Sequence, residues 1–215
     1  MNIEFSQIIP HPLKETEDLF SSEIWAQRDL NLSSPERILI SAPSGKGKST
    51  LLNILYGVRK DYDGLLIIDE ENLTGASENS WNSFRTDRIS KVFQGLELFD
   101  HLTAYENVQL KNELTGHKRE DDILEMFSEL GISNLKNQKT MTLSFGQKQR
   151  VAIIRSLCQP FKWLLLDEPF SHLDTLNSEL ALKLITKEAD NLSAGIILTS
   201  LGKVDSEVFT KSLKL

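Results

Sequence analysis

The chain has 215 residues, 40% of them apolar, which is enough for one large α/β domain with a substantial core. Its formal net charge of -7 comes from acidic and basic residues mixed along the chain, which argues against a surface dedicated to nucleic acid. No apolar run is long enough to span a membrane, and no secretion signal is visible at the start, so we expect a cytoplasmic protein.

Short apolar runs rich in β-forming residues alternate with helical patterns, which predicts an α/β fold with a parallel sheet and helices on its faces. No internal repeat and no Pro/Gly-rich linker suggests a second independent domain, so we expect one domain over residues 1–215. The predicted strands are Arg37–Ser41, Leu65–Asp69, Ile89–Phe93, Trp163–Asp167 and Ile196–Ser200.

The middle of the chain carries apolar residues at helical spacing. This pattern predicts helices over Tyr105–Leu114 and Arg119–Leu130, which together form an α-helical insertion. A later helix has a leucine stripe at Leu176, Leu180 and Leu184, which we expect to pack in the core.

A glycine-rich segment, Ala42–Thr50 (APSGKGKST), lies between a predicted strand and a helical run. Its glycines permit a tight turn in which backbone N–H groups face inward at a helix N-terminus, as phosphate binding requires. Lys48 adds a positive charge, and the Ser49 hydroxyl can ligate Mg²⁺. Ala42 stands where the strict phosphate-loop pattern has glycine, which a negative φ would tolerate. A simple strand-to-helix turn is the alternative interpretation.

A second chemical signal is the apolar strand Trp163–Asp167, which ends in Asp167 and Glu168. Ligands bind at the carboxyl ends of strands in open α/β sheets. Asp167 can therefore reach the shell of a magnesium ion while Glu168 faces the attacking water. Alone, such a pair is often only a solvated strand end, but together with the phosphate loop it indicates an NTPase.

Further motifs follow the phosphate loop in a fixed order: Val92–Gln94, Leu143–Gln147, the Asp-Glu pair and Ser171–Asp174. In this order and spacing the chain resembles the ATP-binding cassette (ABC) ATPases over nearly its whole length. Val92–Gln94 is similar to the Q-loop, Leu143–Gln147 (LSFGQ) to the signature LSGGQ, and Ser171–Asp174 to the D-loop of that family. The similarity is greatest to cassettes of the lipoprotein-release, macrolide-export and cell-division types.

The resemblance implies a P-loop NTPase core with a parallel-sheet nucleotide-binding subdomain, an N-terminal antiparallel β portion and an α-helical subdomain at about residues 96–158. It implies ATP and Mg²⁺ as cofactors and a second ABC ATPase subunit in a homodimer. It also implies a separate membrane-spanning permease, which would hold this subunit at the cytoplasmic face of the membrane. The segment Gly95–Val108 looks like the region that receives a coupling helix of the permease.

The family pattern assigns a role to each matching residue. Glu168 would be the base that polarises water, Asp174 would link the two sites of a dimer, and magnesium would be bound by Ser49, Gln94 and Asp167. The signature residues would act in trans on the nucleotide of the second subunit: Ser144, Phe145, Gly146 and Gln147. ATP would contact Ser44, Gly45, Lys46, Gly47, Lys48, Ser49, Thr50 and Gln94.

The sequence departs from the family pattern in three places. Phe145 replaces the first glycine of the signature, which we expect to be tolerated because Gly146 is kept. Ser200 stands where a switch histidine is expected, and a neutral hydroxyl cannot carry its positive charge, so hydrolysis is expected to be slow. The residue that stacks on adenine is Phe20, Trp25 or neither.

Three functions are compatible with these motifs. The first is a transport ATPase that drives a permease, which the resemblance favours. The second is a regulatory ATP-binding switch with little hydrolysis, which Ser200 and Phe145 keep open. The third is a soluble ABC protein of DNA repair or translation, although such proteins usually carry a coiled-coil insertion or two fused cassettes.

Overall fold

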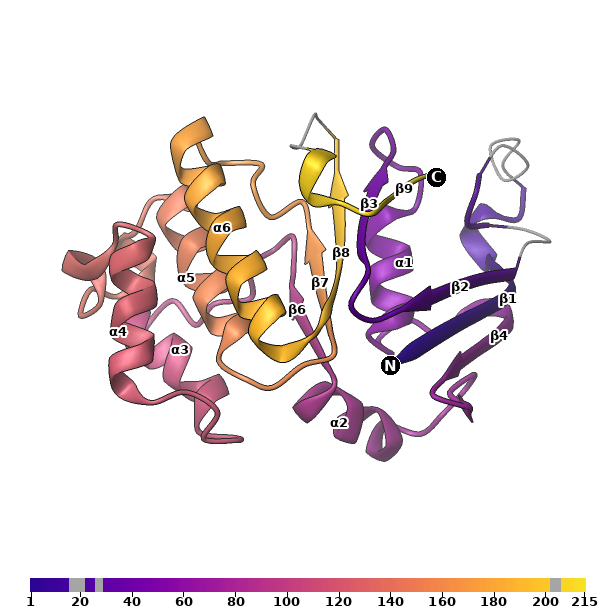
Figure 1. The fold of residues 1–215 in the computed structure, drawn as a ribbon, viewed down its shortest axis with the longest axis horizontal. Coiled ribbons are helices and arrows are strands. Elements are labelled where there is room, and N and C mark those ends of the chain that lie inside the picture. Colours follow the sequence, from indigo (N-terminus) through magenta and orange to yellow (C-terminus); the bar gives the residue numbers. More distant parts are fainter. Residues whose placement is uncertain (16–21, 26–28, 202–205) are drawn as a thin grey trace.

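The computed structural model describes residues 1–15, 22–25, 29–201 and 206–215, and these form two sheets with helices around them (Figure 1). A five-stranded parallel sheet has the order β6-β7-β8-β3-β9, and a four-stranded antiparallel sheet has the order β2-β1-β4-β5. The parallel strands are β3 (Arg37–Ser41), β6 (Ile89–Val92), β7 (Trp163–Asp167), β8 (Gly195–Ser200) and β9 (Lys211–Lys214). The antiparallel strands are β1 (Asn2–Pro10), β2 (Asp29–Ser33), β4 (Tyr62–Ile68) and β5 (Glu71–Asn72).

Four of the five predicted strands lie in the parallel sheet, and the predicted N-terminal antiparallel portion is confirmed. The exception is Leu65–Asp69, which belongs to β4 and pairs antiparallel with β1 instead. More exposed and less exposed positions alternate along β4, as expected of a strand with one solvated face. The apolar run at its end hid this pattern in the sequence.

The helices are α1 (Lys48–Leu55), α2 (Glu78–Asp87), α3 (Ala104–Asn112), α4 (Glu120–Glu129), α5 (Phe145–Leu157) and α6 (Thr175–Leu192). Figure 1 shows α1 between the two sheets, whereas α3, α4 and α5 gather at the other end of the molecule. The predicted helical insertion is therefore present. Of the leucine stripe on α6, Leu184 is fully buried, but Leu176 is 66% exposed, so its predicted core position was wrong. Leu176 lies in the first turn of α6, beyond the edge of the core.

Two apolar clusters cover the two faces of the parallel sheet. Along β7, Leu164 and Leu166 belong to the cluster shared with α3 to α6, whereas Trp163 and Leu165 belong to the cluster shared with α1 and the antiparallel sheet. Successive side chains of a strand point to opposite faces, so a strand covered on both sides is apolar throughout. This packing fixes the ends of the parallel strands, where the candidate site lies.

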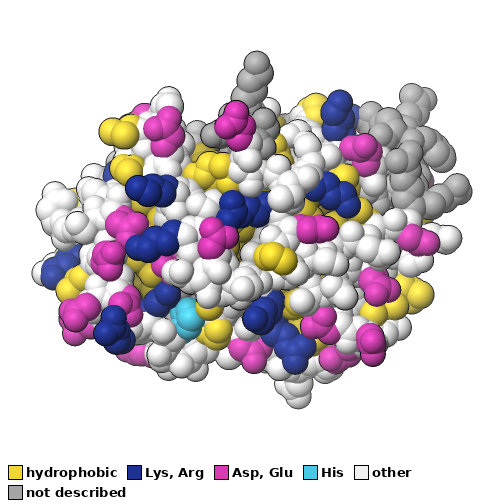
Figure 2. All heavy atoms as spheres, in the orientation of Figure 1, with side chains coloured by type: hydrophobic (Ala, Val, Ile, Leu, Met, Phe, Trp, Pro, Cys, Tyr) yellow, Lys and Arg dark blue, Asp and Glu magenta, His cyan; other side chains and the backbone are white. Residues whose placement is uncertain are grey.

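The surface carries charges of both signs. On the face shown in Figure 2, Lys and Arg side chains of the described residues are interspersed with Asp and Glu side chains. No helix among the described residues is both long and apolar enough to cross a membrane. Cys158 is fully buried, and this burial raises the pKa of its thiol to about 12.

Candidate active site

The phosphate-loop segment joins β3 to α1 through two glycines with left-handed backbones. Gly45 has a φ of 81° and Gly47 a φ of 96°. A Cβ atom on Gly47 would lie 2.9 Å from Leu13 Cδ1 and 3.2 Å from Trp25 Nε1, so no side chain fits there. Ala42 is not among the described residues with positive φ, and its methyl group therefore strains nothing.

Lys48 opens α1 and is only 5% exposed. Its Nζ donates hydrogen bonds to the carbonyl oxygens of Ala42 (2.7 Å) and Pro43 (3.0 Å), and it lies 3.4 Å from Glu168 Oε1. The loop thus surrounds the ammonium group of Lys48, which lies beside Glu168, the catalytic-base candidate that follows β7. A cavity of about 460 Å³ adjoins this point and is lined by loop residues, Gln94, Glu168 and the Pro10–Leu13 segment.

The residues expected to hold magnesium come from three separate elements. Ser49 Oγ donates to Gln94 Oε1 at 3.4 Å, which brings the phosphate loop and the segment after β6 into contact. Asp167 ends β7 and is 4% exposed. Among the described residues no cluster of His, Cys, Asp and Glu side chains forms a complete metal cage. A hydroxyl, an amide oxygen and one carboxylate fit Mg²⁺, which prefers few protein oxygens together with substrate phosphates.

Thr199 on β8 holds both acidic residues of the site. Its Oγ1 donates to Asp167 Oδ1 at 3.0 Å, and the backbone N–H of Glu168 donates to the carbonyl oxygen of Thr199 (3.2 Å). Glu168 has a φ of 50°, an unfavourable conformation for a residue with a side chain. The sequence analysis missed Thr199, whose only signal was a hydroxyl residue within an apolar strand.

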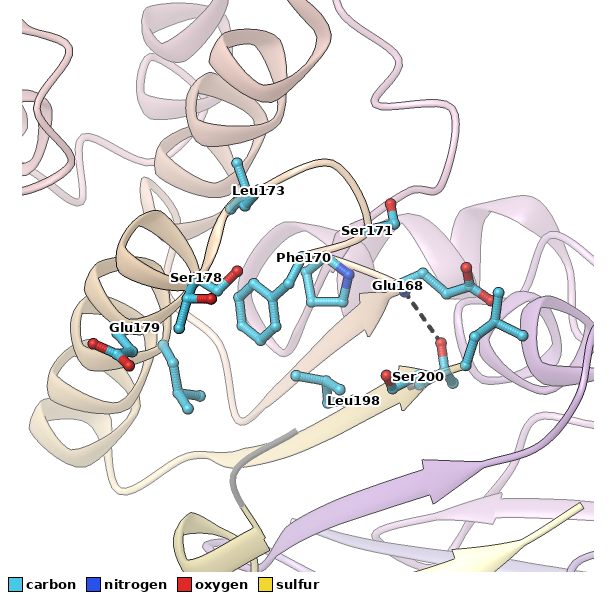
Figure 3. Close-up of a pocket in the computed structure, with 13 residues that line it drawn as sticks. Glu168, Phe170, Ser171, Leu173, Ser178, Glu179, Leu198 and Ser200 are labelled. Carbon is cyan, nitrogen blue, oxygen red and sulfur yellow. Dashed lines mark hydrogen bonds between the residues drawn. The ribbon is translucent and has the colours of Figure 1, made fainter. Parts of the chain in front are cut away.

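Ser200, at the position of the expected switch histidine, is the last residue of β8. It lines a cavity of about 540 Å³ together with Glu168, Phe170 and the D-loop residue Ser171 (Figure 3). The neighbouring pair Asp167 and Thr199 are in register between β7 and β8. The structure therefore brings Ser200 next to the acidic end of β7.

The signature segment forms the N-terminus of α5. Ser144 is the N-cap, and it exchanges hydrogen bonds with Gln147 in a capping box (3.3 Å and 2.8 Å). The Phe145 ring packs against the ring of His172 in the D-loop, with centroids 4.1 Å apart and an interplanar angle of 49°. A Cβ atom on Gly146 would lie 2.7 Å from the carbonyl oxygen of His172. The close approach of the D-loop therefore requires glycine at 146, whereas position 145 has room for a ring.

Gln149, two residues after the signature, was also missed by the sequence analysis. It is 2% exposed, its Nε2 donates to the carbonyl oxygen of Glu168 (3.2 Å), and its Oε1 accepts from the N–H of His172 (3.3 Å). Asp174 is the N-cap of α6 and accepts two hydrogen bonds from Asn177. The bond from the Asn177 N–H lowers the pKa of the Asp174 carboxyl.

The candidate residues fall into two groups in space. The phosphate loop, Gln94 and Glu168 line one cavity, and none of the signature residues Ser144–Gln147 contributes to its lining. Of the adenine-stacking candidates, Trp25 is 2% exposed beneath Gly47 and offers no open face, and Phe20 lies outside the described residues.

The comparison with known proteins decides the family. The ABC transporter family profile matches residues 26–171. This chain belongs to the ABC transporter family. The ABC transporter ATP-binding protein YtrE of Bacillus subtilis is 36% identical over 169 residues, which cover 76% of this chain and 73% of YtrE. The lipoprotein-releasing system ATP-binding protein LolD of Legionella pneumophila is 30% identical over 175 residues, which cover 80% of this chain and 77% of LolD.

Solved structures of an ABC transporter cassette are also similar. The dimeric structure of the Methanocaldococcus jannaschii cassette MJ0796 superposes with a TM-score of 0.79 at 28% identity and covers 99% of this chain and 94% of that chain. A second dimeric structure of MJ0796, in a post-hydrolysis state bound to ADP and Pi, has a TM-score of 0.74. The predicted family and fold are confirmed, and the chain is an ATP-binding, ATP-hydrolysing ABC subunit.

Proposed function

We propose that this chain binds Mg-ATP between its own phosphate loop and the signature segment of a second ABC ATPase subunit. Closure and hydrolysis of this dimer then power a separate membrane-spanning permease. The observation that carries the proposal is the separation of the two half-sites: the cavity around Lys48, Gln94 and Glu168 lacks the signature residues. A second subunit in head-to-tail orientation supplies them.

Within one half-site, the inward amides of Ser44–Thr50 and the Nζ of Lys48 bind the β- and γ-phosphates. Lys48 gives up its bonds to the Ala42 and Pro43 carbonyls in exchange for charged oxygens, because charge-assisted bonds are about twice as strong as neutral ones. Ser49, Gln94 and Asp167 would hold magnesium, which neutralises developing charge on the phosphates. Glu168, aimed at the same cavity, accepts a proton from the attacking water.

The second half-site consists of Ser144, Phe145, Gly146 and Gln147 at the N-terminus of α5. The first N–H groups of a helix lack intrahelical partners and carry partial positive charge, which suits the γ-phosphate of the opposite nucleotide. Since the Phe145 ring lies on His172, we expect it to leave those N–H groups accessible. Asp174, at the start of α6, links the two sites across the dimer, which we take to be a homodimer.

The permease is a separate chain on this proposal, and the subunit is held through it at the cytoplasmic side of the membrane. The segment Gly95–Val108 carries the contact. Two observations support this assignment: LolD is by name a lipoprotein-releasing system component, and Phe99 within the segment is 59% exposed. Exposed large apolar side chains mark interaction sites when they gather with others.

Replacement of Lys48 tests the nucleotide site. Lys48→Ala removes the ammonium group that the loop holds at the phosphate position, so we expect loss of Mg-ATP binding by at least about 100-fold in Kd, the scale of a lost buried charge pair. Isothermal titration calorimetry measures the Kd of each variant for Mg-ATP. Lys46→Ala, in the same loop, is the matched control with a smaller expected effect. An unchanged Kd in Lys48→Ala would refute the assignment.

One observation keeps the regulatory switch as a second candidate. Ser200 lines the cavity beside Glu168 without a group that carries charge at neutral pH. Such a site closes on ATP but hydrolyses it slowly. The turnover of the wild-type protein, with and without its membrane partner, separates the two functions.

A further inference from the structure

Gln149 is a buried amide on the face of α5 that meets the D-loop. Its side chain is 2% exposed, and both of its polar atoms bind backbone groups. The Nε2 donates to the carbonyl oxygen of Glu168 at 3.2 Å, and the Oε1 accepts from the N–H of His172 at 3.3 Å. A carbonyl can only accept and an N–H can only donate, so these partners fix which way the amide points. One side chain thus joins the signature helix to the end of β7 and to the D-loop.

The backbone of Glu168, the catalytic-base candidate, depends on contacts from outside. Its φ of 50° is unfavourable for a residue with a side chain, and such a conformation persists only where the surroundings hold it. The Glu168 N–H donates to the carbonyl oxygen of Thr199. On the other side, the Glu168 carbonyl oxygen accepts from Gln149 and from the N–H of Ser171, a local bond within the turn. Gln149 therefore ties the carbonyl side of Glu168 to a separate element, α5.

The start of the same helix carries the signature. Phe145 and Gln149 are four residues apart and so lie on one face of α5, and both contact His172. Between them, Gly146 lies so near the His172 carbonyl oxygen that a Cβ atom would be 2.7 Å from it. An interface packed this closely leaves little room for α5 to shift independently of the D-loop. A displacement of the helix N-terminus is therefore passed on to Glu168.

We infer that Gln149 is a positioning residue, which sets the backbone of Glu168 according to whether the second subunit's nucleotide occupies the signature. The inference rests on the proposed function, in which the signature and Glu168 serve different nucleotides. An occupied signature holds α5 through the partial positive charge of its N-terminus. The Gln149 amide then keeps the Glu168 carboxylate at the phosphate-loop cavity, 3.4 Å from Lys48 Nζ. Hydrolysis at one site thus depends on ATP at the other.

A second buried glutamine offers a matched control. Gln159, beyond the C-terminal end of α5, is fully buried, and its Nε2 donates to the carbonyl oxygens of Arg85 and Ile89. It belongs to the lining of neither cavity that Glu168 lines. Gln159→Met therefore removes a comparable buried amide away from the site.

The test compares Gln149→Met with Gln159→Met in steady-state ATPase assays over a range of ATP concentrations. Methionine keeps the length of the side chain but cannot replace the two amide bonds. For Gln149→Met we expect kcat to fall about tenfold, the scale of one lost hydrogen bond, at an unchanged half-saturating ATP concentration. The Hill coefficient should fall from a wild-type value above 1 to about 1. Gln159→Met should lower the thermal stability but keep the wild-type kcat and Hill coefficient.

Gln149→Glu adds a pH-dependent measurement. A protonated carboxyl group has the shape of the amide and can donate to Glu168 while it accepts from His172, whereas a carboxylate cannot donate. Burial raises the pKa of a carboxyl group. The ratio of the kcat of Gln149→Glu to that of the wild type should therefore rise as the pH is lowered from about 8 to about 6. The same ratio for Gln149→Met should stay constant.

Four results would overturn the inference: wild-type kcat and Hill coefficient in Gln149→Met, an equal loss of kcat in Gln159→Met, a ratio for Gln149→Glu that does not change with pH, or a wild-type Hill coefficient of about 1. Sedimentation of Glu168→Gln with Mg-ATP separates this failure from that of the proposed function. If that variant stays monomeric, the proposed homodimer fails. If it dimerises and any of the four results is found, only the role of Gln149 is refuted.

Discussion

At the scale of single residues, Thr199 connects the two acidic side chains of the site. It is fully buried, donates to the Asp167 carboxylate, and its carbonyl oxygen accepts from the N–H of Glu168. A buried carboxylate oxygen without its donor costs about 1–3 kcal/mol. Thr199 is therefore a positioning residue, because it acts on the reaction through Asp167 and Glu168.

Replacement of Thr199 tests this role. Thr199→Val keeps the shape but removes the hydroxyl, so we expect turnover to fall about tenfold or more, with a raised Mg²⁺ requirement because Asp167 is no longer oriented. Thr199→Ser keeps the hydroxyl and should restore most of the activity. Steady-state ATPase rates over a range of Mg²⁺ concentrations provide the measurement. Equal rates in the valine variant and the wild type at every concentration would show that the bond is dispensable.

Ser200 is the residue that sets the expected rate. A positioned charged or acid-base group contributes about 10²–10⁴-fold to catalysis, and serine at this position supplies none. Ser200→His is expected to raise the steady-state rate at saturating Mg-ATP. Ser200→Ala serves as the control, since it changes the side chain without adding an imidazole. If wild-type turnover is already ordinary and the histidine leaves it unchanged, the slow-switch alternative loses its support.

At the scale of secondary-structure elements, the N-terminus of α5 gives a prediction in which helix propensity and packing disagree. Alanine is about 1 kcal/mol better than glycine inside a helix. Nevertheless, Gly146→Ala places a Cβ atom 2.7 Å from the His172 carbonyl oxygen, so we expect a net loss of about 1–3 kcal/mol in stability. Phe145→Gly removes the ring contact with His172 without a clash. Chemical denaturation of both variants provides the test, and a stabilised Gly146→Ala would contradict the close approach.

The strands that lead into the phosphate loop and the Asp-Glu pair were predictable from the sequence, because the apolar pattern of each strand and the motif that follows it indicate the same strand end. Arg37–Ser41 and Trp163–Asp167 were found with the observed bounds, since strands buried on both faces are apolar throughout. Leu65–Asp69 was assigned to the wrong sheet because pairing partners far apart in the chain leave no local signal. The role of Gln149 depends on such a distant contact, with Glu168, and was not predictable.

The roles of the individual site residues are predictions that the experiments on Lys48, Thr199 and Ser200 address, and the helical subdomain at about 96–158 stays a prediction from the sequence. The local geometry favours several of them. Ser49 contacts Gln94, and Lys48 lies beside Glu168, as nucleotide binding at this point requires.

At the scale of the whole molecule, ATP should drive association. Glu168→Gln cannot accept a proton from water but keeps the shape of the side chain, so ATP accumulates uncleaved and the closed dimer should persist. Sedimentation velocity with and without saturating Mg-ATP measures the shift from monomer to dimer. Ser144→Ala in the same background is the control and should weaken the dimer through loss of the α5 N-cap. A Glu168→Gln protein that stays monomeric with ATP would indicate a different chain as partner.

The bond from Arg155 to the segment after Gln94 has a mechanical consequence. Leu96 and Glu97 have left-handed backbones, with φ of 62° and 51°, which cost about 1–2 kcal/mol each in residues with a side chain. Arg155, at the far end of the signature helix, holds both carbonyl oxygens. A residue of another element, α5, thus holds this strained backbone in place. Rotation of α5 away from the sheet would break the two bonds from Arg155, and the segment would then relax together with Gln94, which precedes it.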